Sequence, residues 1–189
     1  MAPLMIVGAV PLYNIFAVLI LTFEGNHQKE GKGKLKKALI GILTNPILDA
    51  IALGFLYSIL KLPVPQILNS SLDNLGRMAT PLALICIGGG FEGRKAIKMI
   101  KETLAASIIK LVIQPLLFLP VAVWLGFRGD LLVATIIMTG SPTTPSSYIM
   151  AKNMGHEGVL TSSCVVLTTM LSAITITAQV FIVKYFGLI

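Results

Sequence analysis

The segment from Thr139 to Tyr148 carries the residues best placed to do chemistry. It reads TGSPTTPSSY and sets Pro142, Pro145 and six serine and threonine hydroxyls within an apolar stretch. Proline has no N–H and clashes with the preceding turn, so the backbone groups of residues 140–144 should lose their helical partners. Broken helices of this kind build the substrate sites of secondary transporters. A proline kink in a bundle helix, with serines bonding to their own backbone, explains the same residues equally well.

Two charged side chains are expected deep in apolar segments. Asp49 follows the Asn45-Pro46 pair by one turn and falls at the centre of its segment. A charge at the centre of a membrane costs at least ~2.5 kcal/mol, so Asp49 should face protein or water, or be protonated. Lys110 can pair with Asp49 or extend its ammonium group to the membrane surface. Both residues are candidates for ion or proton coupling.

Other polar residues in the apolar segments have structural explanations that are as good as functional ones. Tyr13 and Asn14 are expected to face inward as a pair, where they contact either a substrate or a neighbouring helix. Asp73 and Arg77 are four residues apart near the end of another segment. We therefore expect them to form an ion pair along one helix face.

No arrangement of side chains typical of an enzyme is present. His27 and His156 lie in loops without a carboxylate cluster or a nucleophile beside them. Cys86 and Cys164 have no neighbouring His or Cys at metal-ligand spacing, and buried thiols usually act as small hydrophobic side chains. The sequence predicts no catalytic residues, no metal site and no cofactor.

The composition is that of an integral membrane protein. Of the 189 residues, 55% are hydrophobic and only 12% are charged, and the mean hydropathy is +0.87. A water-soluble globular protein would carry far more charge. The net charge of +7 comes from lysines in short runs between apolar segments. Such runs anchor a membrane protein, and we predict no nucleic-acid partner.

The elements that position these residues are predicted to be membrane-spanning helices. Roughly 20 helical residues cross the hydrocarbon core of a bilayer. Six apolar segments reach that length: residues 1–23, 38–60, 71–91, 103–126, 131–151 and 159–186. The sequence therefore predicts an all-α fold with six transmembrane helices, the fifth of them broken near the middle of the membrane.

The basic residues predict how these helices are oriented. Ten Lys and Arg residues lie in the loops 24–37, 92–102 and 152–158, and only Lys61 and Arg128 lie in the opposite loops. Positively charged loops stay in the cytoplasm. We expect a multi-pass protein of the plasma (inner) membrane with its C-terminus on the non-cytoplasmic side. The first apolar segment is too long for a signal peptide, and Met1 directly before it is expected of a truncated chain or fragment.

Several motifs together indicate a family. They are PLYNIFAVLIL at 11–21, TNP at 44–46, LGRMATPLALICIGG at 75–89, KLVIQP at 110–115, GFRGDLL at 126–132 and SPTTPSSYIMAKNMG at 141–155. In this order and spacing, the sequence resembles the C-terminal part of an auxin efflux carrier (PIN-like) family permease.

The resemblance implies half of a ten-helix transporter built from two inverted five-helix repeats, a fold similar to that of sodium/bile-acid symporters. Residues 1–23 would be the last helix of the first repeat, 24–37 a basic cytoplasmic loop, and 38–189 the second repeat with its crossover helix at 131–151. Pro142 matches the family pattern, whereas Pro145 lies earlier than the second proline of the plant members. Lys110 matches a position that the family keeps basic.

The function implied is a permease that moves organic anions, such as auxin-like or dicarboxylate compounds, by alternating access. The predicted substrate-binding residues are Ser141, Pro142, Thr143, Thr144, Tyr13 and Asn14, with Asp49 and Lys110 for coupling. The missing helices would come from a complementary chain or a homodimer. The alternative function is a non-transporting membrane subunit or remnant that assembles with another membrane protein.

Overall fold

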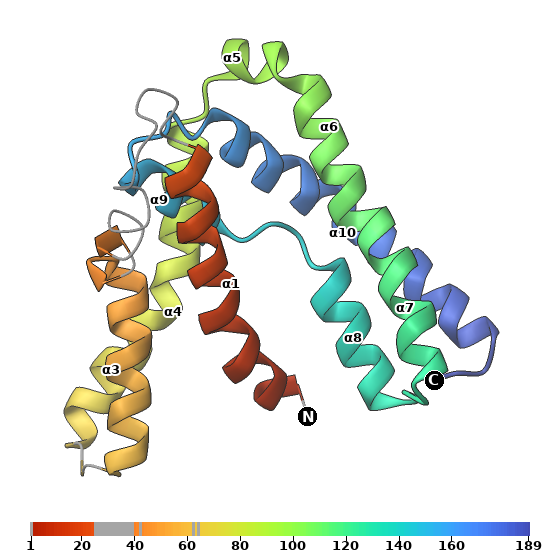
Figure 1. Ribbon diagram of the computed structural model, residues 1–189, viewed down its shortest axis with the longest axis horizontal. Coiled ribbons are helices and arrows are strands. Elements are labelled where there is room, and N and C mark those ends of the chain that lie inside the picture. Colours follow the sequence, from red (N-terminus) through yellow and green to blue (C-terminus); the bar gives the residue numbers. More distant parts are fainter. Residues whose placement is uncertain (1, 25–39, 42, 62, 64) are drawn as a thin grey trace. The chain divides into compact units, whose positions relative to one another are not determined.

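The computed structural model describes residues 2–24, 40–41, 43–61, 63 and 65–189, and the regular elements of this part are all helices (Figure 1). The basic loop expected at 24–37, with Lys34 and Lys36, lies almost wholly outside the described residues. The chain divides into two compact units. The first comprises Met1–Leu4, Ile87–Ile149 and Gly158–Ile189, and the second comprises Met5–Cys86 and Met150–Glu157.

The second unit contains most of α1 (Ala2–Glu24), all of α3 (Pro46–Leu60) and most of α4 (Gln66–Gly89). The expected ion pair within α4 is confirmed, because Arg77 Nη2 lies 2.9 Å from Asp73 Oδ2. Both side chains are largely exposed, so this pair contributes little to stability.

The start of α3 corrects the predicted segment 38–60. The helix begins at Pro46, and the Oδ1 atom of Asn45 accepts a hydrogen bond from the Ile47 amide at 3.0 Å. Asparagine is a favoured N-cap, and proline is tolerated in the first turn because its missing N–H has no partner there anyway. Asp49 therefore lies in the first turn of α3, one turn after Asn45, and its predicted depth at the centre of the membrane stays a prediction.

The first unit is built around one long, irregular helix and two neighbours. α6 (Ile100–Ile108), a π-helical turn η1 (Ile109–Ile113) and α7 (Gln114–Trp124) run on without a loop, after the short α5 (Gly93–Lys98). α8 (Asp130–Gly140) packs on α7, and α10 (Val159–Tyr185) packs on α6 and α8. Ala122, Leu132, Ile136 and Val183 form the buried apolar cluster where these helices meet.

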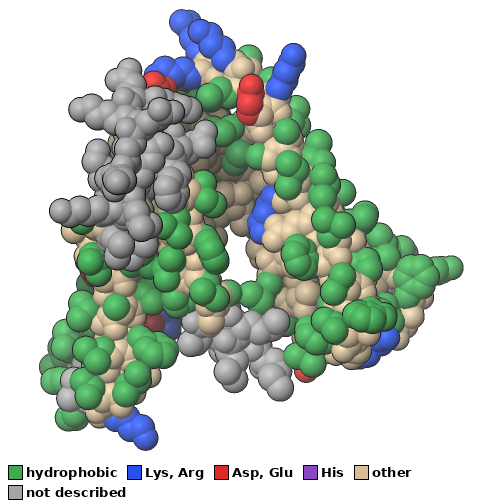
Figure 2. Space-filling view, in the orientation of Figure 1, with side chains coloured by type: hydrophobic (Ala, Val, Ile, Leu, Met, Phe, Trp, Pro, Cys, Tyr) green, Lys and Arg blue, Asp and Glu red, His purple; other side chains and the backbone are tan. Residues whose placement is uncertain are grey.

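Each of the six predicted segments overlaps a helix, with α8 and α9 (Pro145–Asn153) sharing the fifth. Among the described residues, Ile100–Trp124 and Val159–Tyr185 are long and apolar enough to cross a membrane, and Gly8–Leu21, Pro46–Leu60 and Asp130–Gly140 are shorter apolar helices. Large hydrophobic side chains cover the helix surfaces (Figure 2). Trp124 is 84% exposed. Such surfaces suit contact with lipid and not with water.

Candidate functional site

The central feature of the first unit is the break between α8 and α9. α8 ends at Gly140, α9 begins at Pro145, and Ser141 is extended, with φ −62° and ψ 145°. Proline disfavours a helical conformation in the residue before it, so Pro142 acts on Ser141 and Pro145 acts on Thr144. The two prolines therefore have different roles. Pro142 ends the first helix, whereas Pro145 fixes the first turn of the second.

A hydroxyl from α10 holds the broken backbone in place. The Thr143 amide donates a hydrogen bond of 3.0 Å to Thr168 Oγ1. Thr168 is 1% exposed, and its hydroxyl donates in turn to the carbonyl of Cys164 at 2.6 Å. An unpaired amide inside a membrane would cost several kcal/mol. The sequence reasoning did not find Thr168, although it lies in the last apolar segment, which is rich in serine and threonine.

The remaining hydroxyls near the break mostly bond locally. Ser141 Oγ donates to the Ile137 carbonyl of α8, and Ser147 Oγ donates to the Thr144 carbonyl at 2.8 Å. The hydroxyls of Thr144 and Ser146 lie 2.8 Å apart. Back-bonding of this kind is what a packing kink predicts, whereas the contact from Thr143 to α10 fixes an open stretch of backbone.

Lys110 lies in the π-helical turn and contacts a neutral partner. Its Nζ atom donates to Gln114 Oε1 at 3.1 Å, and Lys110 is half-buried. π-helical turns are rare and occur often at functional sites. The alternative predicted partner, Asp49, belongs to the second unit, so a pair between Asp49 and Lys110 stays a prediction.

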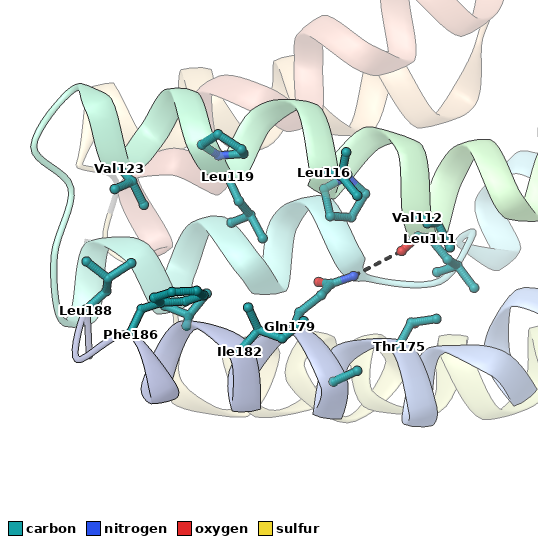
Figure 3. A pocket seen from close by; sticks show the side chains of 14 residues that line it. Leu111, Val112, Leu116, Leu119, Val123, Thr175, Gln179, Ile182, Phe186 and Leu188 are labelled. Atoms are coloured by element: carbon teal, nitrogen blue, oxygen red, sulfur yellow. Dashed lines mark hydrogen bonds between the residues drawn. The ribbon is translucent and has the colours of Figure 1, made fainter.

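An apolar cavity of about 450 Å³ lies beside this turn, between α7 and α10 (Figure 3). Leu111, Leu119, Ile182 and Phe186 are among its lining residues, and Gln179 provides an amide group to it. The Nε2 atom of Gln179 donates to the Leu111 carbonyl at 3.0 Å, shown as a dashed line in Figure 3. The polar contact thus lies in the wall of a cavity that is otherwise mainly hydrophobic.

The predicted pair in α1 does not face one way. Asn14 is 2% exposed and donates through Nδ2 to the Val10 carbonyl at 2.8 Å, whereas Tyr13 is 46% exposed. Successive residues of a helix point in directions about 100° apart, so the two side chains leave α1 in different directions. That the two residues face one binding site stays a prediction.

Asp49 lines a second cavity of about 660 Å³ between α1 and α3. Its neighbours there include Pro11, Ile15 and Phe55. Because Tyr13, Asn14 and Asp49 belong to the second unit and the break belongs to the first, their meeting in one binding site stays a prediction.

Comparison with known proteins gives the family. A family model described as membrane transport protein matches residues 7–180, which include both interrupted helices. The chain belongs to this family. It is 25% identical over 169 residues to an uncharacterized transporter of Methanothermobacter thermautotrophicus, covering 89% of this chain and 53% of that protein. No solved structure matches the chain.

A plant relative confirms the resemblance to auxin efflux carriers. The chain is 28% identical over 134 residues to a probable auxin efflux carrier component 5c of Oryza sativa subsp. japonica, covering 68% of this chain and 36% of that protein. The chain therefore spans about half the length of one family member and about a third of the other. Family membership makes the apolar helices those of a membrane transport protein.

Proposed function

We propose that this chain forms part of a secondary transporter that moves organic anions across the plasma (inner) membrane by alternating access. The observation that carries the proposal is the non-helical stretch between Gly140 and Pro145, within a chain of the membrane transport protein family. Broken helices in transporters place helix ends at the substrate. Six membrane-spanning helices, of which the last five form one inverted repeat, are part of this proposal.

The preference of the proposed site for a negatively charged substrate follows from the direction of α9. Its N-terminus lies at Pro145, beside the break, and the N-terminal end of a helix carries a partial positive charge and free amides. Such an end favours a carboxylate. We assign the anion to a site lined by residues 141–144, and we propose that Tyr13 and Asn14 also contact it.

Lys110 and Asp49 are proposed to couple ion or proton movement to transport, because ionisable groups within membrane segments are costly and therefore usually mark ion or proton pathways. Replacement of Asp49 by Asn should then flatten the pH dependence of uptake, because an amide cannot exchange a proton. An unchanged pH profile at equal protein level would reject this role.

The whole transporter needs helices beyond this chain, which a complementary chain or a second copy would supply. Proteoliposomes containing the chain with such a partner should take up labelled malonate, malate or indole-3-acetate above the level of empty liposomes. A stable complex that transports none of these carboxylates would favour the alternative, a non-transporting membrane subunit.

A further inference from the structure

Pro115 removes the usual α-helical donor of one carbonyl inside a long apolar helix. A helical carbonyl accepts from the amide four residues later, and the residue four places after Leu111 is Pro115, which has no N–H. The helix passes through a π-helical turn at this point, where the Gln114 amide donates to Ile109 five residues back. The Leu111 carbonyl therefore lacks its α-helical donor and is open to a donor from another element.

Gln179 of α10 supplies that donor. Its Nε2 atom lies 3.0 Å from the Leu111 oxygen (Figure 3). Leu111 follows Lys110 directly, so this hydrogen bond fixes the turn that carries the lysine. The bond also fixes the orientation of the Gln179 amide, because a flipped amide would place two oxygen atoms against each other.

The other end of the same amide lies against the last residue of α8. A Cβ atom on Gly140 would lie 2.6 Å from Gln179 Oε1 and 3.4 Å from Ile176 Cγ1, so any larger residue would displace the amide. The buried Oε1 atom accepts no hydrogen bond from the described residues and occupies the space that a side chain at Gly140 would need. Gly140 directly precedes the break.

We propose that Gln179 is a positioning residue that couples the π-helical turn of Lys110 to the broken segment 141–144. One rigid amide contacts both helix interruptions, so neither can change conformation without releasing the other. The inference rests on the proposed function, because the two segments that Gln179 links are both parts of the proposed transport site. It names a residue that contacts neither substrate nor ion.

Hydrogen exchange of the full chain in lipid nanodiscs, followed by mass spectrometry without ligand, tests the coupling. Gln179→Leu should raise amide exchange in both 109–114 and 141–147 by roughly two- to tenfold, the effect of losing one net hydrogen bond. Gly140→Ala keeps Gln179 but displaces its amide, so it should raise exchange at 109–114 although the change lies in α8. Gly140→Ala therefore tests the coupling even if Gln179→Leu does not fold.

Thr175→Val is the matched control. Thr175 lies one turn earlier on α10, lines the same cavity, and donates only to the Leu171 and Ser172 carbonyls of its own helix. Thr175→Val should leave amide exchange in 109–114 and in 141–147 unchanged. For Gln179→Leu, exchange that rises in only one segment or in neither would overturn the coupling. An equal rise in Thr175→Val, or no rise at 109–114 in Gly140→Ala, would overturn it as well. No ligand is present, so these outcomes are independent of whether the chain transports an anion.

Discussion

At the scale of single residues, Thr168 stabilises the non-helical backbone of the break. Its hydroxyl accepts from the Thr143 amide and donates to the Cys164 carbonyl, so one buried side chain uses both of its hydrogen-bonding functions. The prolines deprive backbone amides in the break of their helical acceptors, and the Thr168 hydroxyl replaces the acceptor of the Thr143 amide. A proline kink alone would need no such contact from another helix.

Thr168→Val should destabilise the protein by about 1–3 kcal/mol, because valine has nearly the same shape but leaves the Thr143 amide buried and unpaired. Thr177→Val is the control, since Thr177 is exposed and donates only to Ala173 of its own helix. Unfolding of both variants in mild detergent gives the comparison. Equal stability of the two would show that the contact to Thr143 contributes nothing.

At the scale of elements, the main features are two helix interruptions, the break between α8 and α9 and the π-helical turn η1. The break before Pro145 could be predicted from the sequence, because proline acts on its own backbone and on the residue before it. The partners of the freed groups could not, because Thr168 and Gln179 are distant in sequence and α10 offers many hydroxyls. The π-helical turn was also missed, although Pro115 signals that the Leu111 carbonyl lacks a donor.

The start of α3 carries a prediction at the same scale. Asn45→Ala should destabilise the protein by about 1 kcal/mol, because the Ile47 amide loses its side-chain acceptor. Asn45→Ser should keep most of the stability, since serine caps a helix about as well. Chemical unfolding of the two variants tests this, and a serine variant as unstable as the alanine variant would assign the loss to packing around Asn45.

At the scale of the whole molecule, charge asymmetry predicts the orientation in the membrane. The all-helical membrane class could be predicted from the sequence because hydropathy averages over many residues, whereas the count of six spanning helices stays a prediction. Sequence patterns say little about contacts between residues far apart in the chain, so the predicted roles of Tyr13, Asn14 and Asp49 at the transport site stay predictions.

Cysteine labelling tests the orientation. In a background without Cys86 and Cys164, cysteines placed at Lys95 and Lys98 of α5 should stay unlabelled by a membrane-impermeant maleimide in intact cells, because basic loops remain in the cytoplasm. A cysteine at Arg128, in the opposite loop, should react. Labelling of α5 with protection of position 128 would reverse the orientation.

The measurement that tests the anion site most directly is ligand-induced thermal stabilisation of wild type and Pro142→Ala, each assembled with its partner helices. Malonate, malate and indole-3-acetate are the probes. Pro120→Ala is the matched control, because Pro120 lies inside α7 away from the break. Pro142 has no N–H and lies outside both helices, so Pro142→Ala removes no hydrogen bond, and it should change stability without ligand by no more than about 1 kcal/mol.

We predict that a carboxylate raises the melting temperature of wild type and of Pro120→Ala, and that Pro142→Ala loses most of this rise. A more continuous helix would pair the amides that the anion otherwise contacts. Full retention of the ligand-induced rise in Pro142→Ala, or no rise in wild type with any of the three carboxylates, would contradict the assignment of the broken helix as an anion site.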